Sequence, residues 1–306
     1  MTTPNRAQLR QFLQKYYSDE ELEIIVFDHF PEVGDLFTIG MTKPQKVMQL
    51  IGYAERSGMA EKLLVVAGSG SKAAACQQFF SYVDSKTGLE MRYIPLGSFL
   101  YGENKERREL PSYWISKTPV TNAVYKRFLD ANPQHRVPQA AFDSQKPYAW
   151  DEKKRTFPSD KANHPVVLVS WYDAMAFANW TEMTLPTEEQ WEKAARGTDG
   201  RDYPWGVWCE GCANTWEAGV RGTTANGRYS RQGDSLYGCV DMSGNVWEWT
   251  ATELELGGRV LRGGSFDFNR DFALLSHRNL FGGDFSDLDV GFRCVAPLFC
   301  PLVPDF

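Results

Sequence analysis

The 306-residue sequence has few of the residues that build metal centres and disulfide frameworks. It contains only six cysteines and four histidines, and both are scattered along the chain. Cys209 and Cys212 have the spacing of half a zinc site, but no second cysteine pair or histidine partner follows at a suitable distance. We therefore expect two neighbouring loop cysteines there, and neither a metal nor another cofactor in the protein.

Long apolar runs and an excess of basic residues are also missing. No stretch approaches the roughly 20 apolar residues that span a bilayer, and the polar N-terminus has no signal-peptide core. The formal net charge is −6, so no basic patch is expected to neutralise phosphate groups. These absences argue against nucleic acid and membranes as partners. They favour a cytoplasmic protein whose cysteines stay reduced.

Aromatic residues and turn formers are abundant instead. Aromatic residues make up 14% of the chain, with 10 Trp, and the chain also contains 26 Gly and 16 Pro. This composition predicts a loop-rich fold with buried tryptophans rather than a helical bundle over most of the chain. The length allows one large domain or a large and a small one.

The first 66 residues have the apolar spacing of helices. Leu9, Phe12 and Tyr16 recur at helical intervals. Capping boxes that begin at Ser18 and Thr42 predict the starts of two further helices. The sequence thus predicts a small all-helical domain, of a size that is only marginally stable alone.

Residues 67–82 are predicted to be a linker. The run from Ala67 to Ser71 is small and polar, which is typical of flexible linkers. A phosphate-binding loop is the alternative for Gly68–Lys72, but the preceding strand and the full glycine spacing are missing.

Residues 83–306 carry short strand and helix patterns separated by turns. His164–Ser170 predicts a strand that stops at a serine cap, and apolar residues at helical spacing follow it as far as Trp180. A second helix is predicted over Glu188–Arg196, and a tryptophan-rich strand over Gly244–Thr250.

Residues 259–295 have a glycine-containing motif at each end. The sequence between these motifs has no regular hydrophobic period. In this middle part, phenylalanines alternate with aspartates. Such a segment cannot bury a regular apolar face as an ordinary helix or strand. Aromatic residues among short polar ones are typical of a recognition surface. The alternative is an irregular loop that packs its phenylalanines on the core.

The helical domain resembles the effector-associated domains of bacteria, which have a death-domain-like fold. The resemblance is carried by Leu9, Tyr16-Tyr17-Ser18, Asp19-Glu20-Glu21-Leu22, Leu50-Ile51 and Arg56-Ser57-Gly58. It implies an adaptor that recruits an effector protein with a similar domain. A helical cap that merely packs on the main domain is the alternative.

The larger region resembles the formylglycine-generating, sulfatase-modifying family. The motifs, in the family's order, are VVLVSWYDA (166–174), LPTEEQWEKAARG (185–197), YPWG (203–206), DMSGNVWEWT (241–250), RVLRGGSF (259–266) and GFRCV (291–295). The resemblance implies a C-type-lectin-like fold, so the whole chain is expected to be α+β. It also implies buried anchors at Trp191, Trp247 and Trp249, and internal charge-assisted bonds for Arg262 and Arg293.

The same resemblance bears on catalysis. Active members bind copper through two cysteines that lie three and eight residues after the serine of the GGS motif, and here those positions are Phe268 and Ala273. Neither side chain can supply a thiolate. A calcium site is also not expected, because Asn214 could match one ligand but a later aspartate is missing. We therefore predict that the protein is not an enzyme, with an oxidase of this family or an inactive pseudo-enzyme as the alternatives.

A scaffold of this kind with its catalytic centre replaced resembles the variable proteins of diversity-generating retroelements. The resemblance implies a binding surface for an unknown protein or other macromolecule, displayed within residues 259–295. Loss of the cysteines by drift in an inactive relative is the alternative. The candidate variable positions are Phe266, Asp267, Phe268, Asn269, Asp271, Phe272, Asn279, Leu280, Phe281, Gly282, Phe285, Asp287, Leu288 and Asp289.

Overall fold

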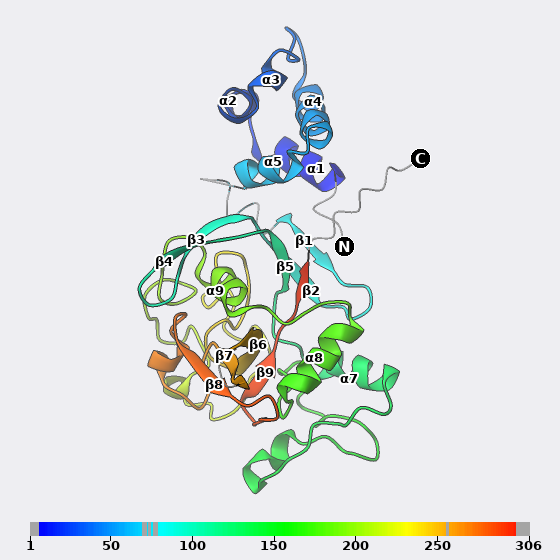
Figure 1. Cartoon of the computed structure of the whole chain (residues 1–306), viewed down its shortest axis with the longest axis vertical. Coiled ribbons are helices and arrows are strands. Elements are labelled where there is room, and N and C mark those ends of the chain that lie inside the picture. Colours follow the sequence, from blue (N-terminus) through cyan, green and yellow to red (C-terminus); the bar gives the residue numbers. More distant parts are fainter. Residues whose placement is uncertain (1–5, 69–71, 73–74, 76–78, 255–256, 298–306) are drawn as a thin grey trace.

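The computed structural model describes residues 6–68, 72, 75, 79–254 and 257–297. A small helical domain lies at one end of the molecule and a larger α+β domain at the other (Figure 1). The predicted α+β class is confirmed. The helices of the small domain are α1 (Arg6–Tyr16), α2 (Asp19–His29), α3 (Pro31–Gly34), α4 (Lys43–Arg56) and α5 (Ala60–Ala67).

Local capping and apolar spacing explain the helical domain. The Ser18 hydroxyl accepts from the Glu21 N–H at 3.1 Å, and the Glu21 carboxylate accepts from the Ser18 N–H at 2.8 Å. A second capping box joins Thr42 and Gln45 at the start of α4. Both predicted helix starts are therefore confirmed. The apolar faces of the helices meet in one core that includes Phe12, Leu22, Val26, Leu50 and Leu64.

The described residues of the larger domain form three small sheets. Their strands follow the orders β1-β2-β5-β10, β3-β4 and β8-β7-β6-β9, and every pairing is antiparallel except the one between β6 and β9. The strands are β1 (Ser81–Val83), β2 (Glu90–Ile94), β3 (Gly97–Tyr101), β4 (Glu106–Leu110), β5 (Tyr113–Ser116), β6 (Trp247–Glu253), β7 (Arg259–Arg262), β8 (Arg278–Phe281), β9 (Val290–Phe292) and β10 (Val295–Pro297).

Three α-helices and several short 3₁₀ turns complete the part of this domain that the structure describes. In Figure 1, α8 and α7 flank one side of the sheets, and α9 lies beside the hairpin of β3 and β4. The α-helices are α7 (Asn122–Ala131), α8 (Trp171–Trp180) and α9 (Glu188–Arg196), and the 3₁₀ turns used below are η2 (Asp143–Tyr148), η3 (Trp216–Ala218) and η5 (Arg270–Ala273). Within the described part of the chain, no helix is both long enough and apolar enough to cross a membrane.

The predicted strand at His164–Ser170 is wrong. Only an isolated bridge between Thr121 and Pro165 forms there. The apolar side chains are buried, as their hydrophobicity requires, but Leu168 has a φ of 61°. That left-handed backbone interrupts any extended pairing. The Leu168 N–H instead donates to the Asp287 carbonyl at 3.0 Å.

The cysteine predictions need one correction. Cys209 and Cys212 form a disulfide, with Cα atoms 5.6 Å apart, which lies in the ordinary bridging range. The expectation that this pair is reduced is therefore wrong. Cys239 and Cys294 are free and buried, whereas Cys76 and Cys300 lie outside the described residues.

The described ends of the predicted linker, residues 67–82, belong to the two domains. Ala67 is the last residue of α5, and β1 begins at Ser81. Phe80 is fully buried, with its ring centroid 5.1 Å from that of Phe12 on α1 and 6.3 Å from that of Tyr93 on β2. Phe80 thus packs against both domains. The glycine-serine run at 69–71 lies outside the described residues.

Candidate ligand-binding site

Two buried ion pairs fix the ends of the 259–295 segment. At the end of β7, the Arg262 guanidinium is paired with the Glu192 carboxylate of α9. Just after β9, Arg293 Nε lies 2.6 Å from Glu248 Oε2, and Arg293 Nη2 lies 2.7 Å from Glu248 Oε1. These bonds confirm the predicted internal roles of Arg262 and Arg293.

The predicted tryptophan anchors are also confirmed. Trp191, Trp247 and Trp249 are all buried. The Trp191 indole donates to Glu248 Oε2 at 2.8 Å, so one anchor is part of the same charge network. Burial of large aromatic rings contributes strongly to the stability of a core.

The two glycines after β7 form a turn with backbone angles that other residues rarely adopt. Gly263 and Gly264 have φ angles of 98° and 71°, which favour glycine. A Cβ on Gly264 would lie 2.9 Å from the Phe272 carbonyl oxygen and 3.0 Å from the Ala273 backbone. Next in the chain, Ser265 donates to Asp289 Oδ2 at 2.6 Å. This bond ties the two ends of the segment together.

The main chain between these ends is held by the rest of the domain. Four backbone N–H groups from outside the middle of the segment donate to carbonyl groups within it, at 2.8–3.0 Å. They are Trp216 to Phe268, Trp171 to Gly283, Leu168 to Asp287 and Trp247 to Asp289. Because each bond joins main chain to main chain, it does not depend on which side chain occupies the position.

The segment forms one wall of a pocket of about 380 Å³, a volume within the range of ligand sites. The candidate residues that line it come from the turn after Ser265, from β8 and from the loop before β9. They are Asp267, Phe268, Asn279, Phe281, Phe285, Asp287, Leu288 and Asp289. The Phe281 and Phe285 rings are stacked, with centroids 4.0 Å apart.

The other candidate residues lie outside the pocket lining. Phe266 is buried with 3% of its surface exposed, so it is a core residue rather than a surface position. Phe272 is half-buried and packs on Phe268. The remaining four are exposed: Asn269, Asp271, Leu280 and Gly282.

One structural expectation for the middle of the segment is wrong. Asn279, Leu280 and Phe281 belong to β8, which pairs with β7 at the edge of its sheet. The side chains of β8 alternate between exposed and half-buried, as expected for an edge strand that is covered on one face only. The sequence signal is weak because the strand has only four residues.

Sequence reasoning missed the opposite wall of the pocket. Phe142, directly before the η2 turn, and Ser144 and Gln145 within the turn line it. Gln145 Nε2 donates to Asp287 Oδ1 at 2.9 Å, so this turn is tied directly to the segment. Phe142 directly follows two alanines and belongs to no periodic pattern in the sequence, and only its exposed fraction of 70% in the structure marks it out.

The pocket is acidic, because Asp267, Asp287 and Asp289 line it. Among the residues that the structure describes, no lysine, arginine or histidine belongs to the lining. Burial raises the pKa of Asp289 to about 6. The hydrogen bond from Ser265 opposes this rise, and the negative charges of Asp287 and Asp267 add to it. The innermost carboxyl therefore titrates close to neutrality.

Replacing Asp289 with asparagine should remove a pH-dependent part of the stability. A carboxyl whose pKa is raised on folding stabilises the protein most below its unfolded pKa, and this contribution is lost as the pH rises through about 6. The wild type should therefore lose up to about 3 kcal/mol relative to D289N between pH 4 and pH 7. Urea unfolding at each pH measures the difference. Parallel stability curves for the two proteins would contradict the raised pKa.

The residues present do not fit a copper ion. Phe268 has no donor atom and packs on Trp247, and Ala273 is fully buried. Burial raises the pKa of Cys239 to about 11 and that of Cys294 well above its usual range, so neither provides a thiolate. Among the residues that the structure describes, no three His, Cys, Asp or Glu side chains are grouped as a metal site.

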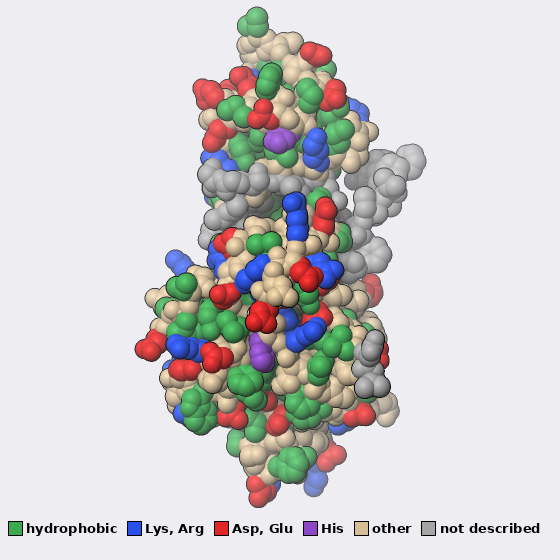
Figure 2. Space-filling model, turned by 60° about the vertical axis from the view of Figure 1, so that its left-hand side comes forward, with side chains coloured by type: hydrophobic (Ala, Val, Ile, Leu, Met, Phe, Trp, Pro, Cys, Tyr) green, Lys and Arg blue, Asp and Glu red, His purple; other side chains and the backbone are tan. Residues whose placement is uncertain are grey.

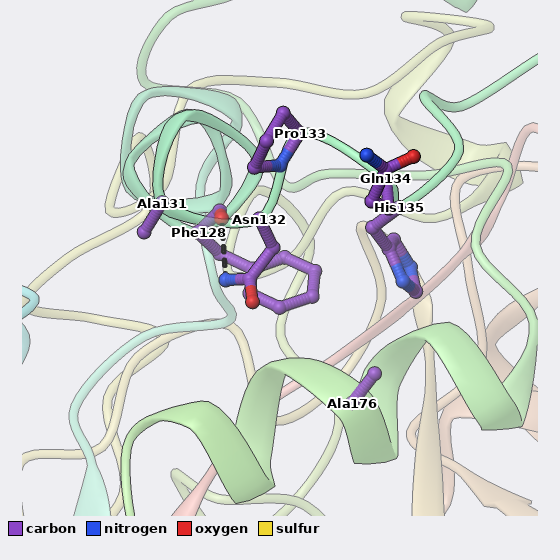
Figure 3. Close-up of a pocket in the computed structure, with 7 residues that line it drawn as sticks. All are labelled: Phe128, Ala131, Asn132, Pro133, Gln134, His135 and Ala176. Atoms are coloured by element: carbon purple, nitrogen blue, oxygen red, sulfur yellow. Dashed lines mark hydrogen bonds between the residues drawn. The ribbon is translucent and has the colours of Figure 1, made fainter.

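A second hollow, of about 440 Å³, lies between the end of α7 and α8. Figure 3 shows its lining, with the Phe128 ring, the His135 imidazole and Ala176 of α8 around the space. The Asn132 amide donates to the Phe128 carbonyl at 2.8 Å, and His135 Nε2 lies 3.1 Å from Asp173 Oδ1. The Asn132 amide is bonded within the fold and His135 lies beside the Asp173 carboxylate, so these two groups offer little to orient a ligand.

Together the fold and the pocket define a lectin-like scaffold whose catalytic position holds no metal-binding side chain. The chain belongs to the sulfatase-modifying factor enzyme 1-like domain family, whose model matches residues 79–298. Residues 9–69 match effector-associated domain 7. Both resemblances stated from the sequence motifs are confirmed.

The relatives of this chain include both active and inactive proteins. It is 34% identical to the formylglycine-generating enzyme of Thermomonospora curvata, over 45% of this chain and 57% of that protein. It is 38% identical to the inactive Cα-formylglycine-generating enzyme 2 of Bos taurus, over 45% of this chain and 50% of that protein. Family membership therefore does not by itself make a protein an enzyme.

A solved structure of variable protein 1 from Treponema denticola shares the fold. The TM-score is 0.53 at 20% identity, and the match covers 71% of this chain and 98% of that one. Together with the family match, this likeness confirms the predicted C-type-lectin-like fold. The chain spans only 36–62% of the length of the first curated relatives that it matches.

Proposed function

We propose that this is a non-catalytic ligand-binding protein that displays a diversified surface within residues 259–295. The observation that carries the proposal is the set of four main-chain bonds that hold the segment from outside. They fix the backbone whatever the side chains are, so side chains can change without unfolding the domain. Phe266 is excepted because it is buried and lies outside the pocket lining. The other candidate positions remain in the proposal.

The pocket supports this function better than a catalytic one. Its aromatic and carboxylate side chains converge on one space, as anchors and polar groups do in binding sites. The position that would carry a metal instead holds Phe268 and a buried Ala273. An inactive pseudo-enzyme is the second candidate, and the relative named inactive favours it.

The DNA beside the gene separates these two candidates. Diversification requires a reverse transcriptase gene and a near-copy of the segment encoding residues 259–295 nearby. We expect both, with differences confined to codons of the candidate positions. If neither is present, the segment is a product of drift, and the pseudo-enzyme is favoured.

Removing the pocket phenylalanines should abolish ligand capture with little loss of stability. Phe268, Phe281 and Phe285 are only partly buried, so each change to alanine should cost less than the ~3–5 kcal/mol of a core phenylalanine. Protein ligands selected from a display library against the wild type provide the probe. Their affinity for the triple variant should fall by about a hundredfold, because aromatic anchors dominate small interfaces.

Phe157 provides the matched control. It is a partly buried phenylalanine that packs on Trp150, far in sequence from the segment and outside the pocket lining. F157A should bind the selected ligands like the wild type. If F157A and the triple variant bind equally well, or if the triple variant is unfolded, the surface assignment fails.

For the helical domain, we propose an adaptor role that recruits an effector protein carrying a similar domain. Ile24 and Phe27 on α2 have exposed fractions of 59% and 82%. Together with Glu20, Glu23 and Asp28 they line one shallow hollow. Figure 2 shows this side of the domain, where hydrophobic and acidic side chains lie next to one another. Together with this role we propose a cytoplasmic location.

A further inference from the structure

We infer that the pocket of this chain takes a cationic side chain, namely the arginine side chain of a protein ligand. The inference rests on the proposed function and adds the chemistry of the ligand to it. Four features of the pocket carry it: its unpaired carboxylates, its stacked aromatic wall, a buried donor without a partner, and its volume.

The three pocket carboxylates have no cation of their own. Among the described residues, Asp267, Asp287 and Asp289 take part in no ion pair, although many aspartates elsewhere in the chain do. Their hydrogen bonds come from neutral donors, which are Gln145 and the Leu288 N–H for Asp287 and Ser265 for Asp289. Like charges gathered in a partly desolvated space favour a cationic partner.

The aromatic wall suits a flat cation. Phe281 and Phe285 stack with an interplanar angle of 11°, and Phe268 meets Trp247 edge to face with a centroid distance of 5.7 Å. A guanidinium group is planar, weakly hydrated and attracted to aromatic faces. It can also form a two-pronged bond to a carboxylate, which a lysine ammonium cannot.

An unpaired donor on a residue of the lining favours a ligand that carries an acceptor as well. Trp247 lines the pocket, and its indole Nε1 is buried without an acceptor among the described residues. A buried donor that stays unpaired is unfavourable. The pocket volume of about 380 Å³ admits more than a cationic head group. An arginine residue presents both parts, a guanidinium group and a peptide carbonyl.

The test uses two small probes that differ in charge and have nearly the same shape. N-acetyl-arginine amide and N-acetyl-citrulline amide are titrated into the full chain, and binding is followed by calorimetry and by the NMR signal of the Trp247 indole N–H. Arginine should bind saturably and about tenfold more tightly than citrulline, as expected for loss of one charged contact. Equal affinities, tighter binding of citrulline, or no saturable arginine binding would overturn the inference.

Matched aspartate variants show whether the pocket itself is responsible. D267N removes an exposed carboxylate of the lining, and D284N removes an exposed carboxylate of the same segment that is outside the lining. The affinity for arginine amide should fall several-fold in D267N, further in D267N/D287N, and remain unchanged in D284N. Equal losses in D267N and D284N would indicate nonspecific charge attraction and overturn the inference.

The proposed function can survive failure of this inference, and the selected protein ligands distinguish the two. Ligands that need the pocket phenylalanines but tolerate D267N/D287N, and whose contact residues are neutral, would keep the binding role and refute the cationic chemistry. If no selected ligand depends on the phenylalanines, the proposed function itself fails.

Discussion

Replacing Glu248 with alanine should lower the free energy of unfolding by about 3–5 kcal/mol, because it leaves a buried guanidinium without its carboxylate. Glu248 is 1% exposed and bonds both Arg293 and the Trp191 indole. Arg293 would keep its bonds to the carbonyl groups of Ser116 and Val240, but these cannot neutralise its charge. Urea or thermal unfolding of the purified variant measures the loss.

The same strand offers the control for this experiment. Glu253 also pairs with an arginine, Arg259, at 2.9 Å, but half of its side chain is exposed. E253A should therefore cost only about 0.2–1 kcal/mol, as exposed pairs do. Similar losses for E248A and E253A would mean that the buried pair does not stabilise the fold, and that something else fixes the ends of the 259–295 segment.

The second large loss of stability is expected when Gly264 is replaced by alanine. A side chain there must adopt a left-handed backbone, which costs about 1–2 kcal/mol. Its Cβ would also press on the Phe272 carbonyl and the Ala273 backbone, and such overpacking costs a further ~1–3 kcal/mol. G264A should therefore lose about 2–5 kcal/mol of stability, measured by chemical unfolding.

Gly282 provides the comparison within the same segment. A Cβ at this position would meet nothing within 4 Å, and the residue is exposed. G282A should change the stability by less than about 1 kcal/mol in either direction. The two glycines thus separate a framework position from a position that is free to vary. A G264A variant as stable as G282A would show that the turn can move, and the fixed-backbone argument would fail.

These pairs of variants also test how the domain tolerates variation. The framework positions, such as Glu248 and Gly264, contact the backbone or charges of distant elements. Most candidate variable positions present their side chains to the pocket or to solvent. Substitutions at framework positions should lower the free energy of unfolding. Substitutions at candidate variable positions should change which ligand the protein binds.

Much of the fold follows from local sequence patterns. The Ser18 and Thr42 capping boxes define helix starts through neighbouring residues alone. The family motifs predict the tryptophan anchors and the internal roles of Arg262 and Arg293, since those residues occur at fixed places in the motifs. The absence of metal-binding side chains at positions 268 and 273 is likewise a property of the sequence.

Other features depend on contacts between residues far apart in the chain, and only the tertiary structure decided them. Leu168 has the hydrophobicity of a strand residue, but its N–H is bonded to Asp287, and its backbone is left-handed. Phe266 has aspartates and other phenylalanines as neighbours in the sequence, as a surface aromatic residue would, yet it is buried. Phe142 and Gln145 complete the pocket although more than a hundred residues separate them from the segment.

The sequence by itself determined that the protein has a helical domain, a lectin-like scaffold and an irregular segment rich in phenylalanine and aspartate. It could not determine which of these side chains share one space. Local patterns specify helices, turns and alternation because the interacting residues are neighbours. A pocket is defined by the packing of separate elements, so the carboxylates and the stacked rings meet only in the folded chain.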